Sequence, residues 1–268
     1  MISGDALYHS PRVAAGYAYA RPAIHPRILK RVREALRIAV PLARALDVGC
    51  GAGRSTVALE PLARRLVGVD PAWAMLRHRG DVAPGARFVV GRAEHLPFSA
   101  GAFDLVTAAG AINYADAGAA LPEIARVLAP GGTFVIYDFS AGRRFDRDGR
   151  LQAWYATFDA RHPEPPGYSM DVTRLPFGGA GLALDRHEEL EIAVEMSMDA
   201  YVRYVMSETR IELALAAGAA ERDIRAWCER TLWGLFGGEP RQVVFDCWYA
   251  CVRSGVVSEP AARNDDCR

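Results

Sequence analysis

Residues 45–53 read Ala-Leu-Asp-Val-Gly-Cys-Gly-Ala-Gly, and residues 68–70 read Gly-Val-Asp. The apolar residues of the first stretch predict a short buried strand, and the glycines after it predict a turn that a ligand can approach closely. Asp70 ends the next predicted strand, 21 positions after Gly49. In doubly wound folds, an acid about 20 residues past such a turn holds the two hydroxyls of a ribose. The two stretches therefore predict a site for a nucleoside-bearing cofactor.

The spacing of the glycines narrows the choice of cofactor. A dinucleotide fingerprint needs a third glycine at position 54, where this chain has Arg54. A phosphate loop needs Lys-Ser or Lys-Thr after its last glycine, and neither pair occurs in the chain. The remaining pattern is G-x-G-x-G, formed by Gly49, Gly51 and Gly53.

This pattern resembles the glycine motif of class I S-adenosylmethionine (SAM) methyltransferases. Four further segments resemble that family in order and spacing, and these are residues 68–76, 91–98, 103–109 and 126–133. The resemblance covers about residues 40 to 140 and is greatest to the small-molecule branch called type 11. Residues 17–22, Tyr-Ala-Tyr-Ala-Arg-Pro, resemble the N-terminal lid of trans-aconitate-methyltransferase-like proteins.

The resemblance implies a role for each part of the motif. Pro71 and Met75 would pack on the adenine ring, and Ala93 and Glu94 would lie near its edge. Arg92 stands where many relatives have an acid. The complete set of expected cofactor-binding residues is Asp47, Gly49, Gly51, Gly53, Asp70, Pro71, Met75, Ala93, Glu94, Ala109 and Gly110.

Simpler structural roles remain open for three of these features. Asp70 precedes a proline and can cap the helix that begins there. Asp47 can fix the cofactor's ammonium group, order the glycine loop, or bond a nearby backbone amide. Residues 94–97 can form an ordinary surface turn.

The alternation of strands and helices predicts a doubly wound, Rossmann-like α/β fold. Parallel strands are expected near residues 45–49, 65–70, 86–91, 103–108 and 133–139. Residues 189–196 alternate between apolar and charged, as in an edge strand, whereas residues 243–252 are apolar almost throughout. The last strand must therefore lie inside the sheet and pair antiparallel. The predicted seven-stranded order is 3-2-1-4-5-7-6, with strand 7 antiparallel.

We expect one methyltransferase domain over residues 1–256 and a disordered tail over 257–268. An amphipathic helix is predicted at 26–40, within an N-terminal lid that spans residues 1–40. Pro61 should shorten or kink the first crossover helix. Cap elements are expected at 146–184 and 199–236, and they comprise helices at 146–162, 199–217 and 221–236 and a glycine-rich loop at 167–184.

Composition restricts the partners. The 268 residues include 32 basic and 32 acidic side chains, and this balance argues against nucleic acid as a partner. The sequence shows no signal peptide and no apolar run of about 18 residues, which favours a cytoplasmic protein with no membrane partner. The five cysteines form no C-x-x-C motif, and no His/Cys cluster has metal-ligand spacing. The oligomeric state is left open.

Methyl transfer needs a positioned acceptor, and a general base only if the acceptor must lose a proton. The candidates for this chemistry are Tyr114, Asn113, Asp138 and His162. Asp138 can instead cap a turn, and His162 can simply end a helix. Tyr17, Tyr19, Arg21 and Tyr168 are expected to contact substrate or form a lid, although the first two tyrosines can also anchor the N-terminal arm.

The sequence thus favours SAM-dependent methyl transfer to a small molecule. Three alternatives remain at this point. The first is a methyltransferase that acts on RNA or protein. The second is an NAD(P)-binding oxidoreductase. The third is a SAM-binding module without catalytic activity.

Overall fold

The computed structural model describes residues 7–164 and 170–254, and its centre is the parallel sheet that the sequence predicts. Five parallel strands lie in the order β3-β2-β1-β4-β5. Their bounds are Leu42–Val48 for β1, Ala63–Asp70 for β2, Arg87–Val90 for β3, Phe103–Ala109 for β4 and Leu128–Phe139 for β5. The last four residues of β1 are buried, as expected for a strand covered on both faces.

The connections between these strands are short helices. The first crossover helix, α4, is only Arg54–Val57, so the predicted shortening before Pro61 is confirmed. The others are α5 (Trp73–Leu76), α6 (Arg79–Val82), the 3-10 turn η1 (Ile112–Tyr114) and α7 (Ala117–Val127). Apolar side chains of α7 pack on one face of the sheet, and the N-terminal helix α3 (His25–Ala35) packs on the other.

The C-terminal strands follow the predicted arrangement. Strand β8 (Arg241–Ser254) lies antiparallel between β5 and β7 (Leu182–Met196), so the apolar strand is internal and the alternating strand is at the edge. The sheet has eight strands and not seven, because β6 (Arg144–Phe145) also pairs with β8. Strand β5 pairs with β8 only over Cys247–Arg253, and β6 supplies backbone partners at Val243 and Val244.

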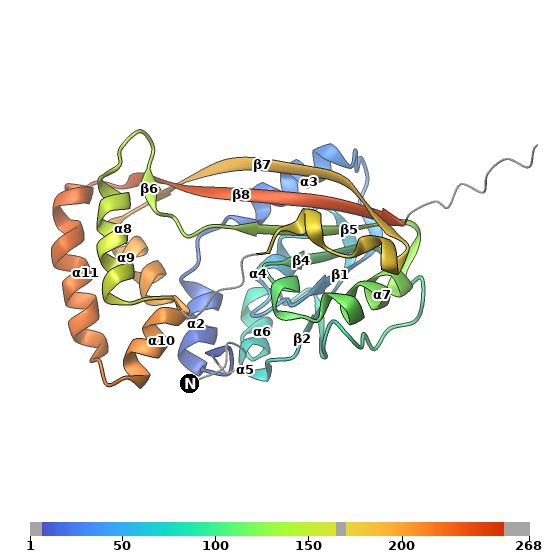
Figure 1. The fold of residues 1–268 in the computed structure, drawn as a ribbon, viewed down its shortest axis with the longest axis horizontal. Coiled ribbons are helices and arrows are strands. Elements are labelled where there is room, and N and C mark those ends of the chain that lie inside the picture. The colour runs from blue at the N-terminus through green and yellow to red at the C-terminus, as the bar shows by residue number, and fades with distance from the viewer. Residues whose placement is uncertain (1–6, 165–169, 255–268) are drawn as a thin grey trace, which may run out of the picture.

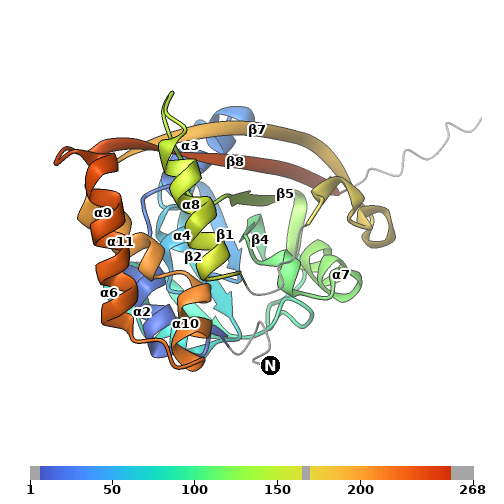
Figure 2. The same ribbon diagram turned by 60° about the vertical axis from the view of Figure 1, so that its left-hand side comes forward.

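Figure 1 shows that the β7–β8 ribbon continues past the parallel strands to a group of helices at one end of the molecule. We call this group the helical cap, and it consists of α8 (Arg150–Arg161), α9 (Met198–Met206), α10 (Thr209–Ala216) and α11 (Glu221–Phe236). Figure 2 shows the same four helices gathered beside the N-terminal helix α2 (Pro11–Tyr19).

Three cap predictions are corrected in their bounds. The single helix predicted at 199–217 is divided, because Glu208 is extended and precedes α10. The helix predicted at 146–162 begins only at Arg150, since Arg147 has a φ of +55°. The loop predicted at 167–184 gives way to β7 at Leu182, which pairs with Ser254, and it contains two 3-10 turns, η2 (Val172–Arg174) and η3 (Phe177–Ala180).

The N-terminal helix predicted at 26–40 is also shorter than expected. It ends at Ala35, and Arg37 adopts a left-handed φ of +53° that the helix cannot continue through. The preceding helix α2 packs directly on the cap. Arg12 donates to Glu212 at 2.6 Å and to the Met206 carbonyl at 2.7 Å. Residues 1–6 and the tail at 257–268 lie outside the described residues.

Within the described ranges, none of the helices is long and apolar enough to cross a bilayer.

Candidate cofactor and acceptor site

The glycine turn adopts a backbone conformation and a close packing that leave little room for side chains. After β1, the amides of Gly49 and Cys50 both donate to the Val69 carbonyl, at 2.8 and 3.1 Å. Gly49 and Gly51 have φ values of +69° and +53°, in the left-handed region that favours glycine. A Cβ at Gly49 would lie 2.3 Å from the Cβ of Ala111. The turn therefore brings bare backbone to the carboxyl ends of β1 and β4.

Asp47 holds the glycine turn in place through contacts with α4 and β4. Its carboxylate is fully buried and accepts hydrogen bonds from the hydroxyls of Ser55 at 2.6 Å, Thr56 at 2.7 Å and Thr107 at 2.9 Å. Burial nevertheless raises its pKa to about 6. These contacts tie β1 to α4 and β4, so the arrangement supports the loop-ordering role for Asp47 among those considered.

Asp70 lies at the end of β2, on the cavity side of the glycine turn. Its Oδ2 accepts from the Gly51 amide and its Oδ1 accepts from the Ala72 amide, both at 2.8 Å. Burial raises the pKa of this carboxyl. Each carboxylate oxygen has two acceptor positions, so the two backbone bonds leave capacity for further donors from a ligand.

A cavity of about 340 Å³ opens over the carboxyl ends of these strands. Small-molecule sites commonly have volumes of about 300–1,000 Å³. The cavity brings together most of the cofactor residues expected from sequence, namely Gly49, Gly51, Asp70, Pro71, Met75, Ala93, Glu94, Ala109 and Gly110. It also contains Asn113, Tyr114, Asp138, Tyr17 and Arg21 from the candidate acceptor residues.

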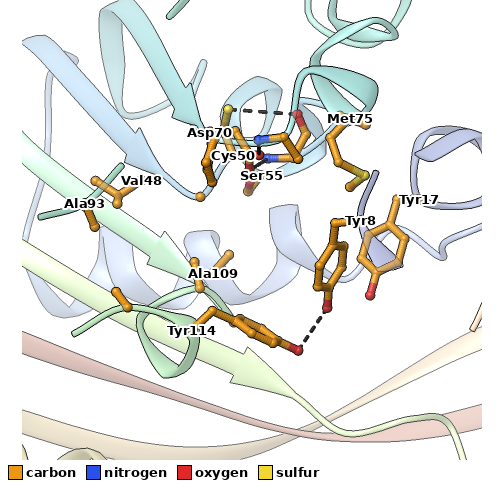
Figure 3. Close-up of a pocket in the computed structure, with 18 of the residues that line it drawn as sticks. Tyr8, Tyr17, Val48, Cys50, Ser55, Asp70, Met75, Ala93, Ala109 and Tyr114 are labelled. Carbon is orange, nitrogen blue, oxygen red and sulfur yellow. Dashed lines mark hydrogen bonds between the residues drawn. The ribbon is translucent and has the colours of Figure 1, made fainter. Parts of the chain in front are cut away.

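Three tyrosines form the wall of the cavity that lies opposite Asp70 (Figure 3). Tyr8 packs edge-on against Tyr17 and Tyr114, with ring centroids 5.8 and 5.5 Å apart. The Tyr8 hydroxyl donates to the Tyr114 hydroxyl at 2.9 Å. This tyrosine wall joins the N-terminal segment to the turn after β4 and encloses the cavity on that side.

Charged and ionisable groups also line the cavity. Asp138 is partly buried and accepts from the Phe139 amide at 2.8 Å. Arg21 packs over the Tyr17 ring, with its guanidinium carbon 4.1 Å from the ring centroid. His25 has a ring nitrogen 3.1 Å from the Tyr137 hydroxyl. Burial, then Arg54 and Arg21, lower the pKa of His25 to about 3, so this imidazole is neutral at physiological pH.

Four predicted residues lie outside the cavity, and a fifth cannot be placed among the described residues. Asp47 and Gly53 support the turn from outside the cavity. Tyr19 is 58% exposed and donates to Asp81 at 2.8 Å on the outer surface. His162 ends α8 in the helical cap, where its carbonyl accepts from Arg210. Tyr168 lies outside the described residues.

The sequence interpretation missed four prominent cavity residues, which are Tyr8, His25, Arg54 and Phe139. Phe139 directly follows Asp138 at the end of β5, so its position at the strand end was available as a signal. The other three belong to no recognised spacing. Among the residues that the structure describes, no group of three or more His, Cys, Asp or Glu side chains could hold a metal ion.

The pKa of Asp138 leads to a prediction about stability. Burial raises this pKa from 3.8 to about 6, so the ionised form destabilises the fold. The protonated form of Asp138 contributes its full stability below about pH 4, and this contribution is lost as the pH rises through about 6. We expect Asp138→Asn to match the wild type near pH 4 and to exceed it by up to about 3 kcal/mol at pH 7.5. Urea unfolding of both proteins across this range measures the difference, and a pH-independent difference would contradict the assignment.

A parallel sheet with a glycine turn after β1 and an acid ending β2 is typical of α/β proteins that bind a nucleoside cofactor. Residues 46–136 match the model of a family described as a methyltransferase domain. This match agrees with the resemblance to class I SAM-dependent methyltransferases that the sequence motifs of the same segment indicate.

Individual relatives agree with this placement. The uncharacterized methyltransferase YcgJ of Bacillus subtilis is 36% identical over 104 residues, which cover 37% of this chain and 41% of the relative. A demethylmenaquinone methyltransferase of Beutenbergia cavernae is 38% identical over 101 residues, which cover 37% and 42%. The chain therefore matches less than half the length of these curated relatives.

Similarity to solved structures extends over more of the chain. A structure described as a type II methyltransferase from Anaeromyxobacter dehalogenans has a TM-score of 0.66 at 25% identity. That match covers 84% of this chain and 94% of the other. The YcgJ structure from Bacillus subtilis has a TM-score of 0.50 at 20% identity and shows the shared fold.

Proposed function

We propose that this protein transfers a methyl group from SAM to a small molecule held in the same cavity. The observation that carries the proposal is the pairing of two unlike walls. The glycine turn and Asp70 form one side, and the tyrosine wall of Tyr8, Tyr17 and Tyr114 forms the other.

The residues of the first wall fit the cofactor. The bare backbone at Gly49 and Gly51 permits close approach, and the Asp70 carboxylate has acceptor capacity for the two ribose hydroxyls. Pro71, Ala72 and Met75 offer apolar surface for the adenine ring. When bound, SAM supplies an activated methyl group on a sulfonium centre.

The second wall would hold the acceptor and exclude water from it. Positioning two reactants in a closed site contributes up to about 7–11 kcal/mol to a displacement reaction. Asp138 also lines the cavity, and its pKa of about 6 leaves it ionised at neutral pH. It can therefore accept a proton from an acceptor hydroxyl or amine, if the acceptor must lose one.

The same geometry weighs against the alternatives. The tyrosine wall, with its Tyr8–Tyr114 hydrogen bond, narrows one side of the cavity, which favours a small acceptor over RNA or protein. Arg54 begins α4 where a dinucleotide-binding turn has its third glycine, and this disfavours NAD(P). A purely binding function is distinguished by the transfer assay below.

Asp70→Ala should weaken binding of S-adenosylhomocysteine, the demethylated cofactor, at least tenfold. Each hydrogen bond to a charged acceptor contributes about 1.5–3 kcal/mol, and the variant removes those to the ribose. Titration calorimetry measures the affinity. Asp104→Ala is the matched control, because Asp104 also accepts from a backbone amide, that of Arg44 at 2.8 Å, and does not line the cavity.

Unchanged affinity in Asp70→Ala, or saturable binding of NAD by the wild type, would overturn the cofactor assignment.

Methyl transfer is then followed with methyl-labelled SAM and two fractions of a cell extract. We expect label in the fraction below about 1 kDa. Label confined to protein or RNA would support the macromolecular alternative, and no transfer to either fraction would support the non-catalytic one.

A further inference from the structure

Arg21 presents an unused hydrogen-bonding edge to the cavity. Its guanidinium carbon lies 4.1 Å from the centroid of Tyr17 and 5.4 Å from that of Tyr204. These contacts use the flat face of the group. Among the described residues, Arg21 has neither a hydrogen bond nor an ion pair, and its Nε is buried without an acceptor. A stacked guanidinium keeps its planar N–H edge for a carboxylate or phosphate.

A second guanidinium in the cavity is in a similar state. Arg54 donates from Nη1 to the Ala18 carbonyl at 3.1 Å, but its Nε is buried without an acceptor. No carboxylate of the described chain pairs with it. Both arginines lower the pKa of His25, whose neutral ring cannot offset their charge. Both side chains are partly buried, and a partly buried cation without a contact ion pair is stabilised when a ligand supplies an anion.

The acidic residues that line the cavity form no contact ion pairs with Arg21 or Arg54. Asp70 is held by two backbone amides, and Glu94 pairs with Arg92 at 3.3 Å. Asp138 accepts from the Phe139 amide and forms no ion pair within 4.0 Å. The charges of Asp138 and of the buried Glu208 act on Arg21 from a distance, but neither carboxylate forms an ion pair with it. The cavity thus contains two guanidinium groups without a contact ion pair, and SAM carries only one carboxylate.

Position divides the two arginines between the two ligands. Arg54 is the first residue of α4, directly after the glycine turn, and lies where the amino-acid part of the cofactor is expected. Arg21 lies on the tyrosine wall, against Tyr17, on the side expected to hold the acceptor. Resting on the function proposed above, we infer that the methyl acceptor is a small carboxylic acid whose carboxylate binds the N–H edge of Arg21.

Two details define this subsite further. A single guanidinium matches one negative charge, which suits a monocarboxylate better than a phosphate dianion. Asn113 also lines the cavity, and its Oδ1 is buried without a donor among the described residues. That oxygen can accept a hydrogen bond from an N–H or O–H elsewhere on the acceptor. The subsite would therefore recognise an acid that carries a second polar group.

The test compares carboxylates with their neutral amides on protein saturated with S-adenosylhomocysteine. The probes are benzoate against benzamide, and 4-hydroxybenzoate against 4-hydroxybenzamide, with inorganic phosphate as a further anion. Ligand-observed NMR titration measures binding. We expect the wild type to prefer each carboxylate by tenfold or more, Arg21→Gln to lose the preference, and Arg21→Lys to keep part of it. Equal binding of acid and amide by the wild type, or stronger binding of phosphate, would overturn the inference.

A second measurement separates an acceptor subsite from a cofactor subsite. Binding of S-adenosylhomocysteine is compared with binding of 5′-methylthioadenosine, which lacks the amino-acid part. We expect Arg21→Gln to keep both affinities within about threefold, and Arg54→Gln to weaken only the first, by tenfold or more. The reverse pattern would show that Arg21 holds the cofactor's carboxylate and the inference is wrong. Failure of the wild type to bind S-adenosylhomocysteine would instead refute the proposed function.

Discussion

Gly51→Val should abolish binding of S-adenosylhomocysteine, by at least a hundredfold in affinity, and leave the protein folded. Gly51 has a φ of +53° and lines the cavity, and a Cβ there would lie 3.0 Å from the Cε of Met75. The branched side chain of valine would occupy the space into which the cofactor must come. Titration calorimetry measures the affinity, and circular dichroism measures the fold.

The backbone strain of this substitution needs its own control. Gly181 has a φ of +66°, and a Cβ there meets nothing within 4 Å. It does not line the cavity. Gly181→Val should therefore show a similar loss of stability, about 1–3 kcal/mol, with normal cofactor binding. Normal binding by a folded Gly51→Val protein would mean that the turn does not touch the ligand.

Arg210→Met should destabilise the protein by about 3–5 kcal/mol, because it leaves a buried carboxylate without its counter-ion. Arg210 is 1% exposed, and its Nε lies 2.8 Å from Oε2 of the buried Glu208. Its other nitrogens pair with Asp159 and Glu164. Arg210 thus joins α8 and the segment after it to the start of α10. Urea unfolding measures how much this ionic cluster contributes to the free energy of unfolding.

Two further variants isolate the ionic contribution. The double variant Arg210→Met with Glu208→Gln removes both charges and should recover much of the lost stability. Arg203→Met breaks an exposed helix pair with Asp199, so it should change stability by less than about 1 kcal/mol. A double variant as unstable as the single one would assign the effect to packing of the arginine on Tyr155 and Phe158.

The helical cap affects the cavity through the N-terminal helix. A Cβ at Gly16 in α2 would lie 2.7 Å from the Cβ of Ser207, at the junction between α9 and α10. This close packing places the Arg21 guanidinium, which stacks on Tyr17, 5.4 Å from the ring centroid of Tyr204 in α9. Loosening the cap in Arg210→Met is therefore expected to disturb the tyrosine wall as well as stability.

The sequence by itself determined the order of the main strands and predicted the half of the cavity that the glycine turn and Asp70 form. Alternating apolar and charged residues placed β7 at the edge of the sheet. The continuous apolar run placed β8 inside, because a strand covered on both faces needs apolar residues at almost every position. Gly49, Gly51 and Asp70 were found because the turn and its acid act through backbone conformation and a fixed spacing along the chain.

Only the tertiary structure decided the acceptor half. Tyr17 and Tyr19 are equivalent in the sequence pattern, but residues two apart on a helix point about 200° from each other. Tyr17 therefore lines the cavity, and Tyr19 lies on the outer surface beside Asp81. Arg21 was predicted from the sequence, but His25 reaches the cavity because of how the chain packs after α2, which no local spacing encodes. His162 was separated from the cavity in the same way, since the β7–β8 ribbon and the helical cap fix its position through contacts distant in sequence.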